Sequence, residues 1–186
     1  AIDALRGRVG HYVFISTGQV YLVREGSGRR AACGPGVPNV DGRPSPAREA
    51  DYEGPVMPRP DDRPSDVPSW EYGVGKRAAE DRLVEAWRSE RFPSTRVRIP
   101  MVNGERDPQR RLEAYLARIL DGGPVLLPDG GGAIARHVYA LDVAIALARM
   151  LGDECTLGEA YNLCQDEMPT VFELVAKIRA TGVGVL

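Results

Sequence analysis

The strongest restriction on the fold comes from an unbroken apolar run between two glycine turns, His11 to Ser16. A run without polar alternation is typical of a strand that is buried on both faces, as in a parallel sheet covered by helices. A second strand is predicted at Thr95–Ile99, which is rich in β-branched residues. Helical spacing fills Trp70 to about Arg91 between them. The order strand, helix, strand predicts an α/β fold with His11–Ser16 as a central parallel strand.

Helices and short strands also alternate in the rest of the chain. Further helices are expected at about Pro108–Leu120, with the proline in the first turn, at Asp142–Leu151, buried on much of its surface, and at Thr170–Ala180. Short strands are expected at Pro124–Leu127, Ile134–Tyr139 and Ala160–Leu163. The glycines at 130–132 predict a hairpin-like turn rather than a phosphate cradle, because no helix begins there. Thr170 and Glu173 have the spacing of a capping box.

A segment crowded with proline, glycine, arginine and aspartate occupies residues 24–69. So long a loop inside a compact domain indicates either a substrate lid or disorder. In the helix that follows, Leu83 and Trp87 share a face. They are expected to serve either plain core packing or a homodimer interface.

Tyr72 and Lys76 provide the first indication of chemistry. Residues four apart on a helix lie on the same face, so the lysine ammonium can stabilise a phenolate, which makes the tyrosine a usable general acid or base. The pattern alone is common and usually marks only a solvated helix face. Here an apolar strand that ends in Ser16-Thr17 precedes it, and Thr17 adds a hydroxyl.

Five landmarks in this order resemble the extended short-chain dehydrogenase/reductases, the NAD-dependent epimerase/dehydratase family. They are the segments Ile15–Tyr21, Tyr72–Glu80, Val97–Gly104, His137–Ala144 and Tyr161–Leu163. The resemblance implies a Rossmann-like, doubly wound parallel sheet, a nicotinamide cofactor (NAD or NADP) and chemistry at a hydroxyl or keto carbon of a small molecule, namely a sugar or nucleotide sugar.

The same resemblance implies roles for individual residues. The catalytic set would be Thr17, Tyr72 and Lys76. The cofactor would be bound by Ser16, Tyr72, Lys76 and Pro100. The substrate would be bound by Gln19, Met101 and Arg136. The resemblance also implies a homodimer.

Several positions depart from the family pattern. Met101 stands where nucleotide-sugar members carry an asparagine, and an arginine expected at Ala135 is shifted to Arg136. A shift of one residue turns a strand side chain to the other face, so Arg136 is expected on the surface unless a bulge redirects it. Gln19 replaces an acid/base residue of the dehydratases, which argues against dehydration. The prediction is therefore a broader oxidoreductase or epimerase.

The glycine-rich turn that binds a dinucleotide pyrophosphate is missing from this sequence. We expect residues 1–100 to be the second half of a Rossmann-like domain and residues 101–186 a substrate-binding region interleaved with its last elements. The chain, with a helix end at residues 1–6, would be the C-terminal part of a longer enzyme and inactive alone. The alternatives are a natural short protein and a non-catalytic, epimerase-like binding or scaffold protein.

Composition excludes some classes of function. A formal net charge of −2 gives no electrostatic footprint for nucleic acid, and the arginines between Arg106 and Arg118 are expected on a solvated helix face. No apolar run approaches the ~20 residues that span a bilayer. Three unpaired cysteines (Cys33, Cys155 and Cys164) suggest reduced thiols in a cytoplasmic protein. With only His11 and His137, no metal site is expected.

Overall fold

The structure, a computed structural model, describes residues 2–25 and 46–182. Its main sheet has three parallel strands in the order β1 (Tyr12–Thr17), β2 (Ser94–Ile99) and β5 (Ala160–Asn162). The predicted α/β class with a parallel sheet is confirmed. The position of the first strand is not as predicted, because β2 lies at the centre and β1 at an edge of the described sheet. Most β1 side chains are accordingly half-buried rather than buried.

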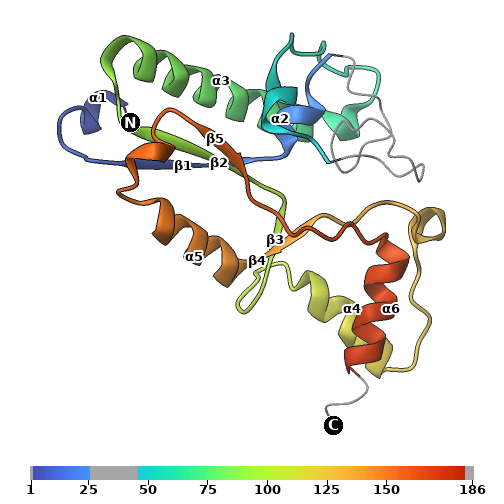
Figure 1. Cartoon of the computed structure of the whole chain (residues 1–186). Coiled ribbons are helices and arrows are strands. Elements are labelled where there is room, and N and C mark those ends of the chain that lie inside the picture. Colours follow the sequence, from blue (N-terminus) through green and yellow to red (C-terminus); the bar gives the residue numbers. More distant parts are fainter. Residues whose placement is uncertain (1, 26–45, 183–186) are drawn as a thin grey trace.

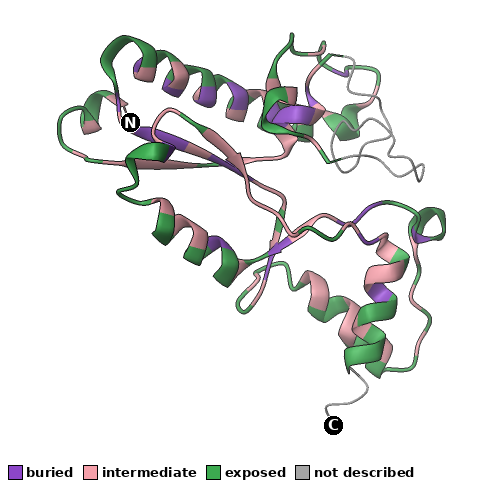
Figure 2. Ribbon diagram, in the orientation of Figure 1, coloured by how far each residue is buried: buried purple, intermediate pink, exposed green. Residues whose placement is uncertain are grey.

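Helices lie on both sides of this sheet (Figure 1), with α3 (Val67–Glu90) on one and α5 (Ala140–Met150) on the other. Leu83 of α3 is buried with Ala86 and Phe92, so core packing is confirmed for Leu83. The expectation of a largely buried α5 was wrong: only Val143 in it is buried (Figure 2), because the helix rests on the protein through a narrow stripe.

A smaller unit lies beyond the carboxyl end of the main sheet. Strands β3 (Met101–Asn103) and β4 (His137–Tyr139) form a parallel pair, and α4 (Arg111–Leu120) and α6 (Val171–Gly182) lie next to each other below it in Figure 1. The predicted capping box at the start of α6 is confirmed. The Thr170 hydroxyl accepts the N–H of Glu173, and the Glu173 carboxylate accepts the N–H of Thr170.

Three expectations for this unit were wrong in detail. Helix α4 begins at Arg111 rather than Pro108, because Asp107 first closes a turn and caps the helix. Residues 124–127 form no strand, and Pro128–Gly131 is a 3-10 turn rather than a hairpin. The physical reason is that β4 pairs in parallel with β3, which leaves the segment before β4 without a partner strand.

The loop predicted at 24–69 is partly built into the fold. Between the short helix α2 (Gln19–Leu22) and α3, residues 46–66 include 3-10 turns at Glu49–Tyr52 and Pro64–Asp66. The Tyr52 hydroxyl donates to the Asp81 carboxylate of α3 at 2.6 Å, which ties the loop to that helix. Residues 26–45, with Cys33, lie outside the described residues.

The predicted helix end at residues 1–6 is the one-turn helix α1 (Ile2–Leu5). None of the helices in the described part combines the length and the apolar character that a membrane span needs.

Candidate active site

A cavity of about 760 Å³ opens where the main sheet meets the β3–β4 unit. Its walls come from the carboxyl ends of β1, β2 and β5, from α3, and from the loop at residues 104–111. Open parallel sheets bind ligands at this edge, because strand ends and loops converge there. The cavity is therefore the candidate active site.

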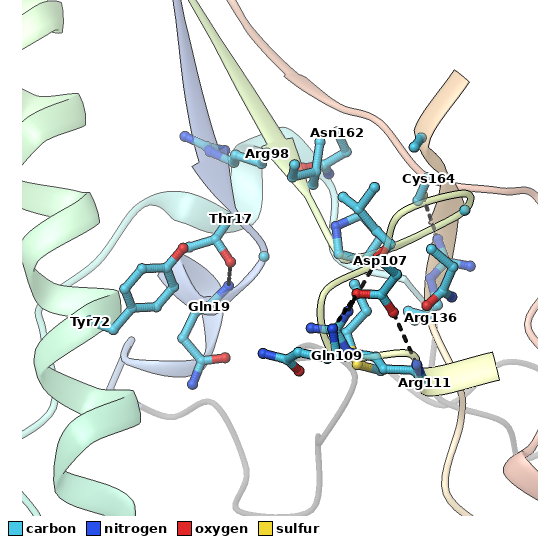
Figure 3. A pocket seen from close by; sticks show the side chains of 18 of the residues that line it. Thr17, Gln19, Tyr72, Arg98, Asp107, Gln109, Arg111, Arg136, Asn162 and Cys164 are labelled. Atoms are coloured by element: carbon cyan, nitrogen blue, oxygen red, sulfur yellow. Dashed lines mark hydrogen bonds and ion pairs between the residues drawn. The ribbon is translucent and has the colours of Figure 1, made fainter. Parts of the chain in front are cut away.

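Thr17 and Tyr72 face each other across one side of the cavity. Figure 3 shows the Tyr72 phenol pointing toward Thr17. The Thr17 hydroxyl oxygen accepts the backbone N–H of Gln19 at 3.2 Å, so its own hydrogen remains to be donated to a ligand. Tyr72 is 52% exposed. The adjacent Gly73 lets α3 pack closely against α2, because a Cβ at position 73 would lie 2.6 Å from a methyl carbon of Val23.

Lys76 lies one turn behind Tyr72, next to β1. Its ammonium donates to the Ile15 carbonyl at 2.8 Å and lies 5.8 Å from the centre of the Tyr72 ring. Lys76 does not itself line the cavity. The structure thus brings Thr17, Tyr72 and Lys76 together at the carboxyl end of β1.

Ser16 points away from the cavity. Successive strand residues face opposite sides, and Ser16 is 2% exposed, with its hydroxyl donating to the Glu80 carboxylate at 2.5 Å. The hydroxyl predicted to contact the cofactor is therefore engaged in the core. Gln19, Pro100, Met101 and Arg136, in contrast, all line the cavity.

A buried ion pair that the sequence reasoning missed lies behind the site. The Arg98 guanidinium of β2 donates to the Glu80 carboxylate of α3, with an Nη2–Oε2 distance of 2.6 Å. Arg98 also donates to the Tyr21 hydroxyl at 2.8 Å, which in turn donates to Asn162 at 2.6 Å. Burial raises the pKa of Tyr21, so its phenol stays neutral. One signal in the sequence could have pointed to this ion pair: Glu80 is an acidic residue four positions after Lys76 and therefore on the same helix face.

The opposite side of the cavity carries three arginines, Arg106, Arg111 and Arg136, and two carboxylates, Glu105 and Asp107. The Arg111 guanidinium pairs with Asp107 at 2.9 Å, and the backbone N–H groups of Arg111 and Gln109 also hold the pKa of Asp107 below its usual range. Arg106 and Arg136 line the cavity, and neither pairs with a carboxylate within the described ranges. Two positive charges are therefore available to an anionic ligand.

The surface position expected for Arg136 was wrong. Among the arginines expected on a solvated helix face, Arg106, Arg110 and Arg118 are exposed, but Arg106 lies in the loop before α4, and Arg111 is only partly exposed because it pairs with Asp107. Arg136 precedes β4 instead of lying in it, so strand alternation does not decide its direction. Its guanidinium contacts the Cys164 sulfur and donates to the Glu167 carbonyl at 3.4 Å.

Known structures share this fold. UDP-glucose 4-epimerase from Thermus thermophilus, solved with NAD, is 24% identical with a TM-score of 0.60, over 98% of this chain and 51% of that one. dTDP-glucose 4,6-dehydratase from Bacillus anthracis, also solved with NAD, is 18% identical with a TM-score of 0.61, and the match covers 96% of this chain and 48% of that one. UDP-glucose 4-epimerase from Thermotoga maritima, solved with UDP-glucose, is 19% identical with a TM-score of 0.62, and the match covers 100% of this chain and 52% of that one.

This chain thus spans about half the length of each of these proteins. A comparison with curated protein sequences gave no match. The sequence profile of the NAD dependent epimerase/dehydratase family matches residues 50–164, from within the first 3-10 turn through α3 to the segment after β5. That match takes in more than half of the 186 residues, and the chain therefore belongs to the NAD dependent epimerase/dehydratase family.

Proposed function

We propose that this chain supplies the catalytic and substrate-binding part of an NAD(P)-dependent oxidoreductase or epimerase that acts on a hydroxyl-bearing carbon of a nucleotide sugar. One observation carries the proposal: a single cavity has Thr17 and Tyr72, with Lys76 behind, on one side and two available guanidinium groups on the other. We assign residues 1–100 to the catalytic part and residues 101–186 mainly to substrate binding.

Proton transfer falls to Tyr72. Its phenolate accepts the proton of the substrate hydroxyl, and the Lys76 ammonium favours that phenolate electrostatically. The Ile15 carbonyl holds the ammonium in place. Thr17 donates a hydrogen bond to the reacting oxygen, because the N–H of Gln19 donates to the Thr17 oxygen and leaves the hydroxyl hydrogen unused.

The residues present fit the nicotinamide end of a dinucleotide. Lys76 has three N–H donors, and the Ile15 carbonyl occupies one of them, which leaves donors for ribose hydroxyls. Tyr72 and Pro100 complete this set, whereas the Ser16 hydroxyl is turned toward Glu80. When bound, a nicotinamide supplies hydride acceptance and return. The sequence has no glycine-rich turn for the pyrophosphate, so we assign residues only to the nicotinamide end.

The substrate side is assigned by charge. Arg106 and Arg136 have the charge and hydrogen-bond donors that a diphosphate requires, while Gln19 and Met101 line the part of the cavity left for the sugar. Gln19 can hydrogen-bond but cannot move a proton, which favours oxidation, reduction or epimerisation over dehydration.

Calorimetric titration of the whole chain with UDP-glucose tests the substrate class. Arg136→Gln is expected to weaken binding roughly tenfold, the scale of one charge-assisted hydrogen bond. Arg88→Gln, a matched change at an exposed residue of α3, is expected to leave binding unchanged. Absence of UDP-glucose binding, or equal effects of the two variants, would contradict the proposal.

Native mass spectrometry of the purified protein tests the cofactor assignment. A bound dinucleotide, or a companion fragment that brings one, supports the enzyme, and turnover of that assembly should disappear in Tyr72→Phe while UDP-glucose affinity is kept. A chain with no dinucleotide under any NAD concentration tested, or turnover unchanged by Tyr72→Phe, would instead favour the non-catalytic binding protein.

A further inference from the structure

Asn103, the last residue of β3, has a buried hydrogen-bond acceptor without a partner. The residue is 5% exposed and belongs to the lining of the cavity. Its amide nitrogen pairs with Nδ1 of His137, but its carbonyl oxygen Oδ1 has no hydrogen-bond partner among the residues that the structure describes. Buried polar atoms in proteins almost always have one. An unsatisfied acceptor on a residue that lines a binding cavity is a candidate contact for a ligand that donates there, once a small shift of the surrounding side chains uncovers the buried oxygen.

The pairing with His137 determines which end of the Asn103 amide remains available, given the tautomer of the imidazole. A neutral imidazole has one acceptor nitrogen, and Nδ1 fills that role when the Asn103 amide N–H donates to it. Burial and the nearby Arg111 guanidinium lower the pKa of His137, which favours this neutral form. The carbonyl oxygen of Asn103 is then the atom left for a ligand.

The chemistry of a nucleotide sugar decides what this oxygen can bind. Diphosphate oxygens only accept hydrogen bonds at neutral pH, so a carbonyl oxygen repels them, and Arg106 and Arg136 are available to them instead. Sugar hydroxyls donate. Met101, two residues earlier on the same face of β3, has no comparable polar group.

We propose that Asn103 Oδ1 accepts a hydrogen bond from a sugar hydroxyl of the substrate and thereby determines selectivity for the sugar over the bare nucleotide. This assignment rests on the proposed function, in which the cavity binds a nucleotide sugar.

The experiment is calorimetric titration of the whole chain with UDP-glucose and with UDP. Asn103→Leu, which keeps the side-chain size, is expected to weaken UDP-glucose binding roughly tenfold and to leave UDP binding unchanged. Asn103→Asp keeps an acceptor, so the preference for UDP-glucose over UDP should persist even if both bind less tightly. Gln165→Leu, an amide-to-leucine change outside the cavity lining, is the matched control and should change neither affinity.

The outcomes separate the two proposals. Unchanged UDP-glucose binding in Asn103→Leu, or equal weakening of UDP and UDP-glucose, would overturn the sugar assignment while the proposed function stands. Loss of the preference in both Asn103→Leu and Asn103→Asp would also overturn it, because the amide N–H would then be the contact. Failure of the unmodified chain to bind UDP-glucose would overturn the proposed function and this assignment with it.

A chemical readout on the same samples locates the ligand. Cys164 lines the cavity, whereas Cys155 is exposed elsewhere. UDP-glucose should slow alkylation of Cys164 several-fold and leave Cys155 unaffected. Protection that is absent although UDP-glucose binds would place the ligand elsewhere and overturn the role of Asn103.

Discussion

The two sides of the cavity are built differently. On the side of β1, α3 and β2, charged groups are buried. Glu80 is 0% exposed, and its partner Arg98 is 3% exposed. On the side of β3, β4, α4 and α6, ion pairs such as Arg110–Glu113 are exposed and α4 has no buried residue (Figure 2). Phe172 of α6 is 59% exposed. The first side can hold a fixed geometry, whereas the second depends on local contacts.

The difference matches the chemistry proposed for each side. Ser16 and Glu80, which hydrogen-bond to each other, flank the proposed catalytic residues: Ser16 precedes Thr17, and Glu80 follows Lys76 by one turn. The hydrogen bond between Ser16 and Glu80 therefore ties β1 to α3, the strand and the helix that carry the residues proposed for proton transfer. The side proposed to bind an anion includes a loop with left-handed backbone at Arg106 and Arg110, which local turns maintain.

The largest expected effect is loss of the buried pair. Glu80→Gln leaves the Arg98 charge buried without a counter-charge, and breaking such a pair costs about 3–5 kcal/mol in the free energy of unfolding. Urea unfolding measures it. Glu113→Gln removes an exposed pair of the other side and should cost less than about 1 kcal/mol. Similar losses in the two variants would remove the contrast between the two sides.

A second test separates packing from backbone strain. Gly152 and Gly158 share a φ of +83°. A Cβ at Gly158 would lie 2.2 Å from the Trp87 indole nitrogen, whereas a Cβ at Gly152 would have no atom of the described residues within 4 Å. Both alanine variants carry the left-handed cost, so Gly158→Ala should be about 1–3 kcal/mol less stable than Gly152→Ala because of overpacking against α3. Equal thermal unfolding midpoints would mean that Trp87 moves aside freely.

The third test concerns the locally stabilised side. Thr170→Ala removes the capping hydroxyl of α6 and should cost about 1 kcal/mol in the free energy of unfolding. Thr181→Ala, at the exposed end of the same helix, should have almost no effect. If Thr170→Ala lowered the free energy of unfolding as much as Glu80→Gln, the proposed difference between the two sides would be wrong.

The smallest expected effect is a pH dependence from His137. Burial, followed by the Arg111 charge, lowers the pKa of His137 in the folded chain. The unfolded chain then binds a proton first as the pH falls below about 6.5, so the free energy of unfolding decreases there until the pH reaches the folded pKa. His137→Asn should remove this part of the slope in thermal unfolding between about pH 5 and pH 8. An identical slope in the variant would contradict it.

Local signals in the sequence predicted most of the elements. The apolar run at β1, the helical spacing of α3 and the Thr170 capping box each depend on neighbours within a few residues, and all three are present in the structure. The positions of Thr17, Tyr72 and Lys76 followed from a resemblance in which order along the chain matters. The predicted elements were wrong where a strand from elsewhere in the chain must supply the pairing. Residues 124–127, for example, pair with no strand in the described part of the chain.

Residues of the site that the sequence did not reveal depend on contacts across long separations. Arg98 meets Glu80 because β2 runs beside β1 beneath α3, and Asn103 meets His137 because β3 pairs with β4. No periodicity marks such pairs. Arg136 illustrates the same limit, since its direction depended on whether a strand begins before or after it.

The sequence by itself determined the α/β class, the helix with its tyrosine and lysine, and family membership, because strand and helix patterns and ordered motifs are properties of neighbouring residues. Only the tertiary structure decided which polar groups are buried, which arginines face the cavity and which amide oxygen is left without a partner. Those outcomes depend on how strands far apart in the chain pair and on what each pairing removes from water.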